Sequence, residues 1–252
     1  MNHWRVVSKK TLMKSKKAGK KLKGKLIVID GIDGSGKATQ VGLLEKRLRK
    51  EKIKVKIIDF PRYYDNFFGR FIGECLSGEH GDFIKTNPRV VSVLYAADRF
   101  ESSEQIKSWL DQGFWVVADR YVSANQIHQG GKIKDSKERR KFLDWLEEME
   151  HGVFKLPYPD RVFYLNVDLE TSVAWLKNKD TQKAKKYLKG KKDLAEVDLD
   201  YLKNSRNTAM SLERKYKNWT KIRCCEKGVC KTPEEIRDMI FAVIEKEIKP
   251  RS

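Results

Sequence analysis

The chain has 252 residues, of which 40% are hydrophobic, and it carries a formal net charge of +19. This length suffices for one large domain or two small domains, each with a buried core. No apolar run approaches the length needed to cross a bilayer, which excludes a membrane-spanning protein.

A large share of the positive charge lies at the N-terminus. Residues 1–25 contain ten Lys or Arg residues and no acidic residue, so +9 of the net +19 belongs to the rest of the chain. The segment lacks the apolar stretch and cleavage site of a secretory signal. We therefore expect a disordered basic tail over residues 1–25 and one folded domain over residues 26–252. Such a tail either stays solvated or makes weak contact with nucleic acid.

The folded domain opens with a strand over residues 26–30, because Leu26–Ile29 is an uninterrupted apolar run, typical of a parallel sheet that is buried on both faces. A glycine-rich loop follows, and the apolar spacing after it predicts an amphipathic helix over residues 36–51. Backbone N–H groups of such a loop and the helix N-terminus both attract phosphate. The spacing Gly31-x-x-x-x-Gly36-Lys37 is that of a P-loop, so we predict a nucleoside triphosphate site.

The residues assigned to this triphosphate site are Gly31, Ile32, Asp33, Gly34, Ser35, Gly36, Lys37, Ala38 and Thr39. One position departs from the P-loop pattern, because Ala38 stands where a Ser or Thr usually contacts Mg²⁺. Thr39 follows directly and is a candidate replacement. A dinucleotide fingerprint does not fit, since it would need a third small residue at Thr39. A glycine-rich turn without a ligand is the structural alternative.

A second strand is predicted over residues 53–60, where apolar and polar residues alternate. Pro61 ends this strand and leaves Phe60 and Arg62 at its carboxyl end. In open parallel sheets, ligands bind at this edge. Phe60 and Arg62 are therefore candidate binding residues.

The spacing of apolar residues predicts one long helix over residues 88–110. Tyr95 and Arg99 on this helix are four residues apart, so they share a face. Together they could stack on a nucleobase and hydrogen-bond to its edge. Alternatively, Tyr95 belongs to the core and Arg99 pairs with a nearby acid such as Asp98 or Glu101.

The third strand is predicted over residues 114–118, which form another uninterrupted apolar run. It ends in Asp119 and Arg120, on the same sheet edge as the P-loop. Asp119 could hold Mg²⁺ directly or through water, and Arg120 could neutralise phosphate with two parallel hydrogen bonds. A structural ion pair between these two residues is the alternative. A polar segment with Asn125 and His128 follows.

The rest of the chain continues the alternation of strands and helices. Helices are predicted at residues 67–76, 134–150, 198–218 and 233–248, and strands at residues 161–167 and 219–224. A helix that begins at Leu169 runs into residues 177–192, which hold eight Lys residues and one acid, Asp180. That segment is either a solvated surface or a mobile lid that closes on phosphates. Five strands interleaved with helices predict an α/β fold with a doubly wound five-stranded parallel sheet.

The chain has four cysteines, Cys75, Cys224, Cys225 and Cys230, and none of them forms a C-x-x-C pair. Their spacing is poor for a zinc site. We therefore expect buried free thiols in a reducing cytoplasm.

Four motifs occur in the order that is typical of one kinase family. They are the P-loop, Phe60-Pro61-Arg62, Tyr95 with Arg99, and Asp119-Arg120-Tyr121. In this order they resemble the thymidylate kinases, a family of P-loop nucleoside monophosphate kinases. The resemblance runs from about Lys25 to the C-terminal helix. The P-loop sequence GSGKATQ is similar to that of a bacterial subgroup that accepts Ala after the lysine.

The resemblance implies transfer of the γ-phosphoryl group of ATP, aided by Mg²⁺, to dTMP, which gives dTDP and ADP. The catalytic residues implied are Lys37, Asp33, Asp119 and Arg120, with Asp119 and Thr39 as metal-ligand candidates. The dTMP-binding residues implied are Asp33, Phe60, Arg62, Tyr95, Arg99, Arg120, Asn125 and His128. The lid implied covers residues 177–196, with Lys185, Lys186, Lys189 and Glu196 near the phosphates.

Within that set, the resemblance gives Arg62 the acceptor phosphate, Tyr95 the thymine ring, and Arg99 and Asn125 the thymine edge. His128 stands where a Tyr often packs against the deoxyribose. A kinase of another nucleoside monophosphate or of a deoxynucleoside is therefore an alternative. A nucleic-acid-associated ATPase or binding module that uses the basic tail is an alternative of a different class. A homodimer is compatible with each of them.

Overall fold

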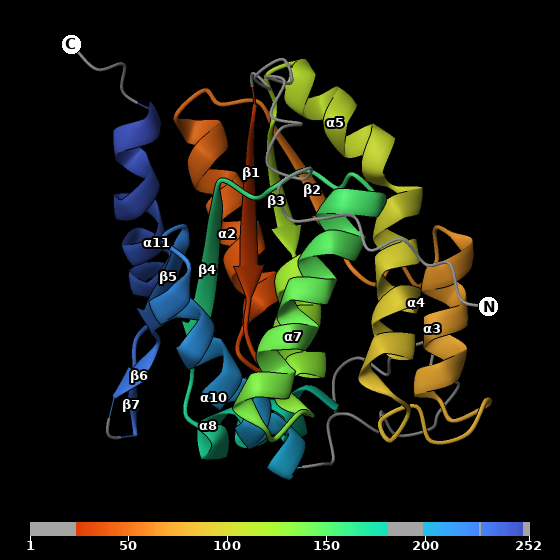
Figure 1. The fold of residues 1–252 in the computed structure, drawn as a ribbon. Helices are drawn as coiled ribbons and strands as arrows, with labels where there is room; N and C mark the ends of the chain where they lie inside the picture. Colours follow the sequence, from red (N-terminus) through yellow and green to blue (C-terminus); the bar gives the residue numbers. More distant parts are fainter. Residues whose placement is uncertain (1–23, 181–198, 227, 249–252) are drawn as a thin grey trace.

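The structure is a computed structural model and describes residues 24–180, 199–226 and 228–248. Their centre is a five-stranded parallel sheet with the strand order β2-β3-β1-β4-β5 (Figure 1). The strands are β1 (Lys25–Asp30), β2 (Val55–Asp59), β3 (Trp115–Asp119), β4 (Arg161–Asn166) and β5 (Trp219–Arg223). The predicted α/β fold with a five-stranded parallel sheet is confirmed.

Successive side chains of the central strands point to opposite faces of this sheet. In β1, Leu26 and Val28 pack into one core cluster, whereas Ile27 and Ile29 pack into the other. Because helices cover both faces, β1 carries apolar residues at consecutive positions rather than at alternate ones. This double burial is the physical reason why its apolar run could be recognised in the sequence.

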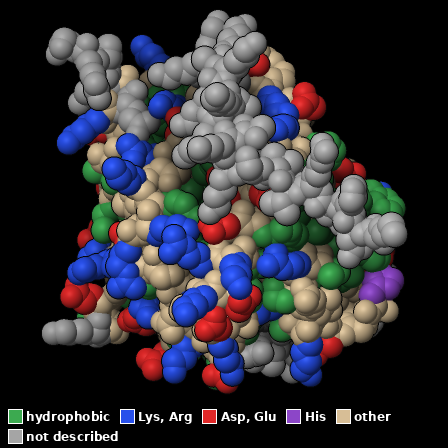
Figure 2. Space-filling model, in the orientation of Figure 1, with side chains coloured by type: hydrophobic (Ala, Val, Ile, Leu, Met, Phe, Trp, Pro, Cys, Tyr) green, Lys and Arg blue, Asp and Glu red, His purple; other side chains and the backbone are tan. Residues whose placement is uncertain are grey.

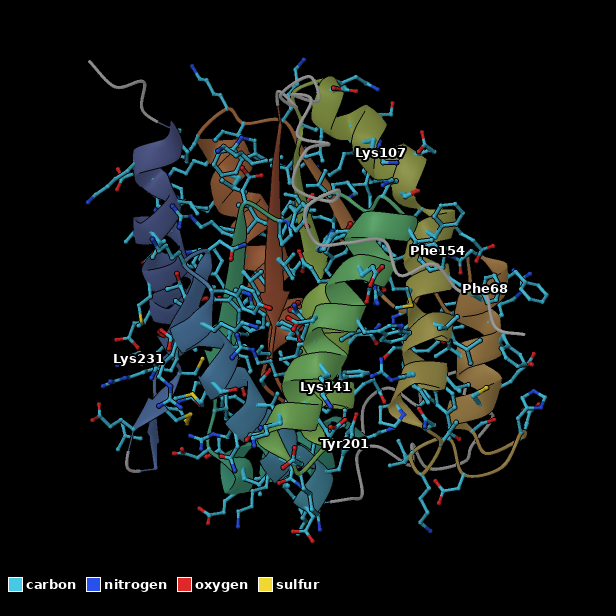
Figure 3. All side chains as sticks on the ribbon, viewed as in Figure 1. Phe68, Lys107, Lys141, Phe154, Tyr201 and Lys231 are labelled. Atoms are coloured by element: carbon cyan, nitrogen blue, oxygen red, sulfur yellow. A yellow bond between two sulfur atoms is a disulfide. The ribbon has the colours of Figure 1, made fainter. Side chains whose placement is uncertain are left out.

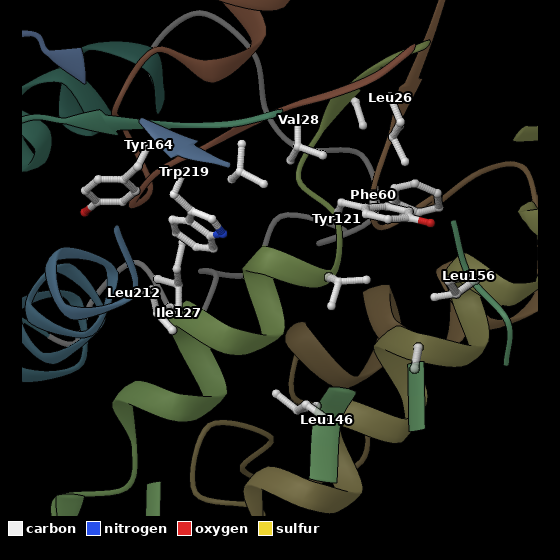
Figure 4. Packing of buried hydrophobic residues seen from close by; sticks show 14 of the residues in the cluster. Leu26, Val28, Phe60, Tyr121, Ile127, Leu146, Leu156, Tyr164, Leu212 and Trp219 are labelled. Atoms are coloured by element: carbon white, nitrogen blue, oxygen red, sulfur yellow. The ribbon is translucent and has the colours of Figure 1, made fainter. Parts of the chain in front are cut away.

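Helices form a layer on each face of the sheet. One layer contains α2 (Lys37–Lys50) and α11 (Pro233–Ile248). The other contains α4 (Pro88–Glu101), α5 (Ser103–Asp111), α7 (Ser136–Glu147) and α10 (Leu199–Lys215). Figure 4 shows the core cluster under this second layer, where the rings of Phe60 and Tyr121 lie 5.9 Å apart. Helix α3 (Phe67–Leu76) lies beside α4, at the edge of the molecule (Figure 1).

Six further elements complete the described part of the chain. They are α6 (Val122–Ala124), the π-helical segments η1 (Asn125–Gln129) and η2 (Glu148–Val153), α8 (Leu169–Asp180), and the strands β6 (Cys225–Glu226) and β7 (Val229–Cys230).

The loops after β1 and β3 leave the sheet toward opposite faces. β1 continues through the glycine-rich loop into α2, whereas β3 continues into α6, η1 and α7 on the other face. β1 and β3 are hydrogen-bonded neighbours in a parallel register. The two loops therefore separate at adjacent strand ends, which is where open α/β sheets form a ligand crevice.

The predicted single helix over residues 88–110 was wrong, because the chain forms α4 and α5 instead. Ser102 lies between them with a ψ angle of −1°, which interrupts the helical path. Ala96 of α4 and Ile106 of α5 nevertheless pack into the same core cluster. The continuous apolar pattern thus reflects one shared core rather than one straight helix.

The prediction of four free thiols was also wrong. Cys225 and Cys230 form a disulfide, whereas Cys75 and Cys224 are buried free cysteines. The short strands β6 and β7 pair in antiparallel fashion and bring Cys225 opposite Cys230 in register. Spacing along the chain did not reveal this pairing, because the hairpin that creates it is only four strand residues long.

The face of the molecule shown in Figure 2 is mixed in charge. On the face shown in Figure 2, Lys and Arg side chains lie among Asp and Glu side chains and are not gathered into one stripe. This mixture is typical of a solvated surface. No helix within residues 24–180, 199–226 and 228–248 combines the length and the hydropathy needed to cross a membrane.

Candidate active site

The glycine-rich loop after β1 forms a bare helix N-terminus. Gly36 precedes α2 with a φ angle of 86°, a left-handed conformation that a residue with a side chain rarely adopts. No side chain caps the N-terminus of α2, and the first turn carries no acidic residue. The unpaired N–H groups and the helix dipole therefore favour an anion at this end.

Lys37 is held inside the same loop. Its Nζ atom donates to the carbonyl oxygens of Gly31 and Ile32, at 3.0 Å each, and lies 3.9 Å from Asp33 Oδ1. Burial, together with the positive charge of Arg120, lowers the pKa of Lys37 to about 8. A bound phosphate would strengthen the charged form, because it would add negative charge beside this buried ammonium group.

Arg120 connects the ends of β1 and β3. Its backbone N–H donates to Ile29 O at 3.0 Å, and its φ angle of 66° turns the side chain out of the strand path. The guanidinium group is ion-paired with Asp33 of the P-loop. The predicted alternative of an ion pair between Asp119 and Arg120 is therefore wrong, because the partner of Arg120 is a residue 87 positions away.

Two further carboxylates lie at these strand ends. Asp30 accepts hydrogen bonds from Gly31 N at 2.8 Å and Ser123 Oγ at 2.6 Å. Burial raises the pKa of Asp30 and also that of Asp119. The Asp119 carboxylate accepts no side-chain hydrogen bond from the described part of the chain, so its oxygens are available to a cation.

His128 lies beside Arg120 in a neutral form. The distance from Arg120 Nη1 to His128 Nε2 is 3.1 Å, and because arginine only donates, Nε2 must accept and the ring proton is on Nδ1. Burial and the charge of Arg120 lower the pKa of His128 to about 3. The ring stacks on Tyr201 of α10, with centroids 5.8 Å apart. Sequence reasoning missed Tyr201, which has no motif around it.

One cavity brings most of the predicted acceptor residues together. Those that line it are Asp33, Phe60, Tyr95, Arg99, Arg120, Asn125 and His128, and the wall also includes Pro61, Tyr63, Leu76, Ala124, Gln129 and Tyr201. These residues come from the P-loop, the loop after β2, α3, α4, the end of β3, α6, η1 and α10. We call this the first cavity.

Arg62 is the predicted acceptor residue that does not line the first cavity. Its side chain pairs with Asp65 at 2.8 Å, and its backbone N–H donates to the Asp98 carboxylate at 3.2 and 3.3 Å. The backbone of Arg62 also lies against α3, where a Cβ atom on Gly69 would meet Arg62 O at 2.0 Å. Close packing of the main chain therefore positions this loop.

Arg99 has a partner that local spacing did not identify. Its Nε and Nη2 atoms each donate to the Glu150 carboxylate at 2.7 Å, and both side chains are at most 1% exposed. The expected alternative partners, Asp98 and Glu101, were wrong. One signal was available, because Glu150 lies four residues after the buried Leu146 and so continues a core-facing stripe.

A second cavity lies on the other side of the P-loop. It is lined by Gly34, Ser35, Gly36, Thr39, Gln40, Trp175, Lys231, Pro233 and Ile236. Gln40 Nε2 donates to Pro233 O at 2.9 Å, which ties α2 to the start of α11. Figure 3 labels Lys231 from this cavity and Tyr201 from the first one. The P-loop thus forms part of the wall of both cavities.

The predicted metal ligands lie at two places, and the predicted lid residues are not among the described residues. Thr39 lines the second cavity, whereas Asp119 lies at the end of β3. Among the residues that the structure describes, no group of three His, Cys, Asp or Glu side chains could hold a metal alone. The lid residues Lys185, Lys186, Lys189 and Glu196 lie outside the described residues.

Comparison with known proteins identifies one family. The model of the family "Thymidylate kinase" matches residues 29–236. The thymidylate kinase of Plasmodium falciparum is 36% identical over 147 residues, which are 58% of this chain and 63% of that protein. That of Prochlorococcus marinus strain NATL1A is 30% identical over 229 residues, which are 87% of this chain and 99% of that protein.

A solved structure supports the fold independently. The thymidylate kinase of Candida albicans superimposes with a TM-score of 0.68, covering 90% of this chain and 94% of that one at 22% sequence identity. The similarity therefore concerns the arrangement of strands and helices. The matched stretch spans somewhat less than two thirds of the Plasmodium protein and nearly all of the Prochlorococcus protein.

Proposed function

The chain belongs to the thymidylate kinase family, and we propose that it transfers the γ-phosphoryl group of ATP to dTMP, which gives dTDP and ADP. The observation that carries this proposal is the position of the P-loop between two cavities. A donor on one side and an acceptor on the other would meet over the same backbone N–H groups. Bringing two bound reactants into line is the main catalytic task in phosphoryl transfer.

The donor belongs to the second cavity. ATP would place its phosphates over Gly31 to Thr39, at the uncapped N-terminus of α2. Lys37 would move from the loop carbonyls to the phosphates, whose negative charge would stabilise its ammonium group. The P-loop sequence with Ala38 is consistent with the bacterial subgroup suggested above.

The acceptor belongs to the first cavity. Phe60 and Tyr95 provide aromatic wall for a thymine ring, and Arg99 and Asn125 provide polar atoms for its edge. Arg120 would face the phosphates, close to Asp33. Asp33 would take the role near the acceptor sugar and metal, and His128 would lie against the sugar.

Arg62 would bind the acceptor phosphate after leaving Asp65. The Asp65 side chain is 55% exposed, so its pairing with Arg62 contributes less than about 1 kcal/mol. An incoming phosphate dianion would compete well for the guanidinium group, since it accepts two parallel hydrogen bonds.

The carboxylate of Asp119 is suited to bind Mg²⁺. Its carboxylate oxygens are the type of ligand that Mg²⁺ prefers, and a site with few protein ligands leaves room for water and phosphate oxygens. Bound there, Mg²⁺ would neutralise charge on the phosphate oxygens. Thr39 is the second candidate ligand.

Arg120 and Lys37 would supply positive charge around the transferring group, and no general base is needed because the acceptor is already an anion. The basic segment at 177–196 would exclude water as a lid.

The test is ADP release by the purified protein with MgATP and a panel of acceptors: dTMP, dUMP, dGMP, dCMP, AMP, UMP and thymidine. We expect kcat/KM for dTMP to exceed that for each other acceptor by at least about tenfold. The matched control is Lys37→Met, which should remove turnover while the protein stays folded.

Other outcomes point to the alternatives. The Candida albicans enzyme is described as having broad substrate specificity, so equal use of several monophosphates would replace dTMP by a wider acceptor class. Preference for thymidine would indicate a nucleoside kinase. ATP hydrolysis that needs DNA and no acceptor would support the nucleic-acid-associated ATPase.

A further inference from the structure

Glu150 joins two side chains of the first cavity through one buried carboxylate. It is fully buried, on η2, and does not itself line the first cavity. Its Oε1 atom accepts from Arg99 Nη2 and from Asn125 Nδ2, both at 2.7 Å, while Oε2 accepts from Arg99 Nε at 2.7 Å. Arg99 and Asn125 are 26 residues apart in the chain and meet at this single oxygen atom.

These contacts determine which way the Asn125 amide faces. Its Nδ2 atom donates to Glu150 Oε1 at 2.7 Å and to Ser92 O at 3.1 Å. A carboxylate and a carbonyl can only accept, so both neighbours require the NH₂ group on their side. The remaining atom, Oδ1, accepts no hydrogen bond from the described part of the chain. Asn125 therefore offers the first cavity an acceptor and not a donor.

The same carboxylate determines what Arg99 offers. Two of its three nitrogen atoms, Nε and Nη2, are used by Glu150. Within the described residues, Nη1 has no hydrogen-bond partner, although Arg99 lines the first cavity. Arginine has no acceptor atom. The wall therefore presents a donor from Arg99 beside an acceptor from Asn125.

This pair matches one kind of pyrimidine edge. Thymine and uracil carry an N3–H donor beside the O4 acceptor, whereas cytosine carries the N3 acceptor beside an N4 amino donor. We propose that Glu150 is a positioning residue that sets the donor and acceptor order of the base site and so selects a keto pyrimidine over an amino pyrimidine. The inference rests on the proposed function, because it assumes that the first cavity holds the acceptor base.

A purely structural ion pair would not need this geometry. Burying two charges is costly, and a hydrophobic pair of similar size often stabilises a fold as well. If Glu150 served only to pair with Arg99, its second hydrogen bond through Oε1, to Asn125, would be unnecessary. Contact with two side chains of the cavity wall is what links Glu150 to recognition.

The test compares Glu150→Gln with wild type on dTMP and on 5-methyl-dCMP, which share the ring methyl group and differ at the N3 and C4 edge. A glutamine side chain can donate, so the Asn125 amide can turn and present its NH₂ group to the cavity. The ratio of kcat/KM for dTMP to that for 5-methyl-dCMP should fall at least about tenfold. The loss should appear in KM for dTMP, with KM for MgATP changed less than about twofold.

Glu148→Gln is the matched control, because Glu148 is an exposed glutamate on the same η2 segment. It should leave the ratio unchanged. If Glu150→Gln fails to fold, as the loss of one buried charge can cause, Glu150→Asp keeps the charge but shortens the side chain by one methylene. It cannot reach Arg99 and Asn125 together, so the ratio should fall in this variant too.

The outcomes separate the two proposals. Wild type without activity on dTMP would overturn the proposed function. Wild type that prefers dTMP, with an unchanged ratio in a folded Glu150 variant, would overturn only the role of Glu150. Equal losses on both acceptors would show that Glu150 supports the fold and does not select the base.

Discussion

Lys37 is only 7% exposed, although lysine side chains usually reach into solvent. The P-loop spacing identifies this residue in the sequence, but its buried state follows from the way the loop closes around it. Its ammonium group donates hydrogen bonds to two carbonyl oxygens. Burial and the positive charge of Arg120 lower the pKa of Lys37 to about 8. The charge that phosphate binding requires is therefore sensitive to mildly alkaline pH.

We expect the affinity for ATP to fall as the pH rises through about 8. The charged form of Lys37 binds phosphate, and above its pKa that form is depleted by up to about tenfold for each pH unit. The phosphates of ATP do not explain such a change, because phosphate groups lose their last proton near pH 6. Calorimetric titration of the protein with ATP between pH 7 and pH 9.5 would measure the dissociation constant and the uptake of protons.

The control for this titration is Lys37→Met, which should bind ATP weakly and without a step near pH 8. A dissociation constant that stays flat from pH 7 to pH 9.5 in the wild-type protein would contradict the assignment of Lys37 to the donor phosphates.

At the level of elements, α3 positions the loop that carries Arg62. Asn66 caps α3 by accepting from Gly69 N at 2.9 Å, and its Nδ2 atom donates to Asp98 O of α4 at 3.1 Å. The Asp98 carboxylate accepts from the backbone of Arg62, and burial raises the pKa of Asp98 to about 6. One cap residue thus connects α3, α4 and the loop after β2.

Asn66→Ala should therefore affect both stability and the acceptor site. Loss of an N-cap costs about 1 kcal/mol of unfolding free energy. Release of the loop should also raise KM for dTMP, because Arg62 would lose its fixed backbone position. Urea unfolding and steady-state kinetics would measure the two effects.

Asp135→Ala is the matched variant, since Asp135 caps α7 through Lys137 N and Glu138 N but is not one of the residues that line the first cavity. It should cost a similar free energy of unfolding and leave KM for dTMP unchanged. Similar increases of KM in both variants would show that general loosening, and not the loop, is responsible.

At the level of the whole molecule, the order of strands creates the site. β1 and β3 are neighbours whose following loops turn to opposite faces. This arrangement brings the P-loop, Arg120 and the first cavity to one edge of the sheet. Ten of the 54 Lys and Arg residues lie in residues 1–25, before the P-loop.

Deletion of residues 2–23 should lower the net positive charge without changing catalysis. The truncated protein should elute from heparin at a lower salt concentration, since fewer positive charges contact the polyanion. Its kcat/KM for dTMP should stay within about twofold of the full-length value, because the residues assigned to the donor and acceptor sites all lie after residue 30. A full-length variant with Gln at the basic positions of this segment is the control for chain length. Loss of turnover in both variants would give the tail a catalytic role.

The sequence by itself determined the five strands, the P-loop and the sheet edge that carries the candidate site. Each of these depends on neighbouring residues, such as the apolar run before Gly31 or the Asp119-Arg120 segment after a strand. Local pattern and backbone geometry are sufficient there, because a central strand that is buried on both faces has apolar residues at consecutive positions. The assignment of roles to these residues remains a prediction.

Only the tertiary structure decided which side chains meet. Arg99 pairs with Glu150, Arg120 with Asp33, and His128 stacks on Tyr201. These partners lie far apart in the chain, and helical or strand periodicity states only that a residue is buried, not what it contacts. Buried charges must find a partner of opposite charge, but packing of separate elements selects that partner.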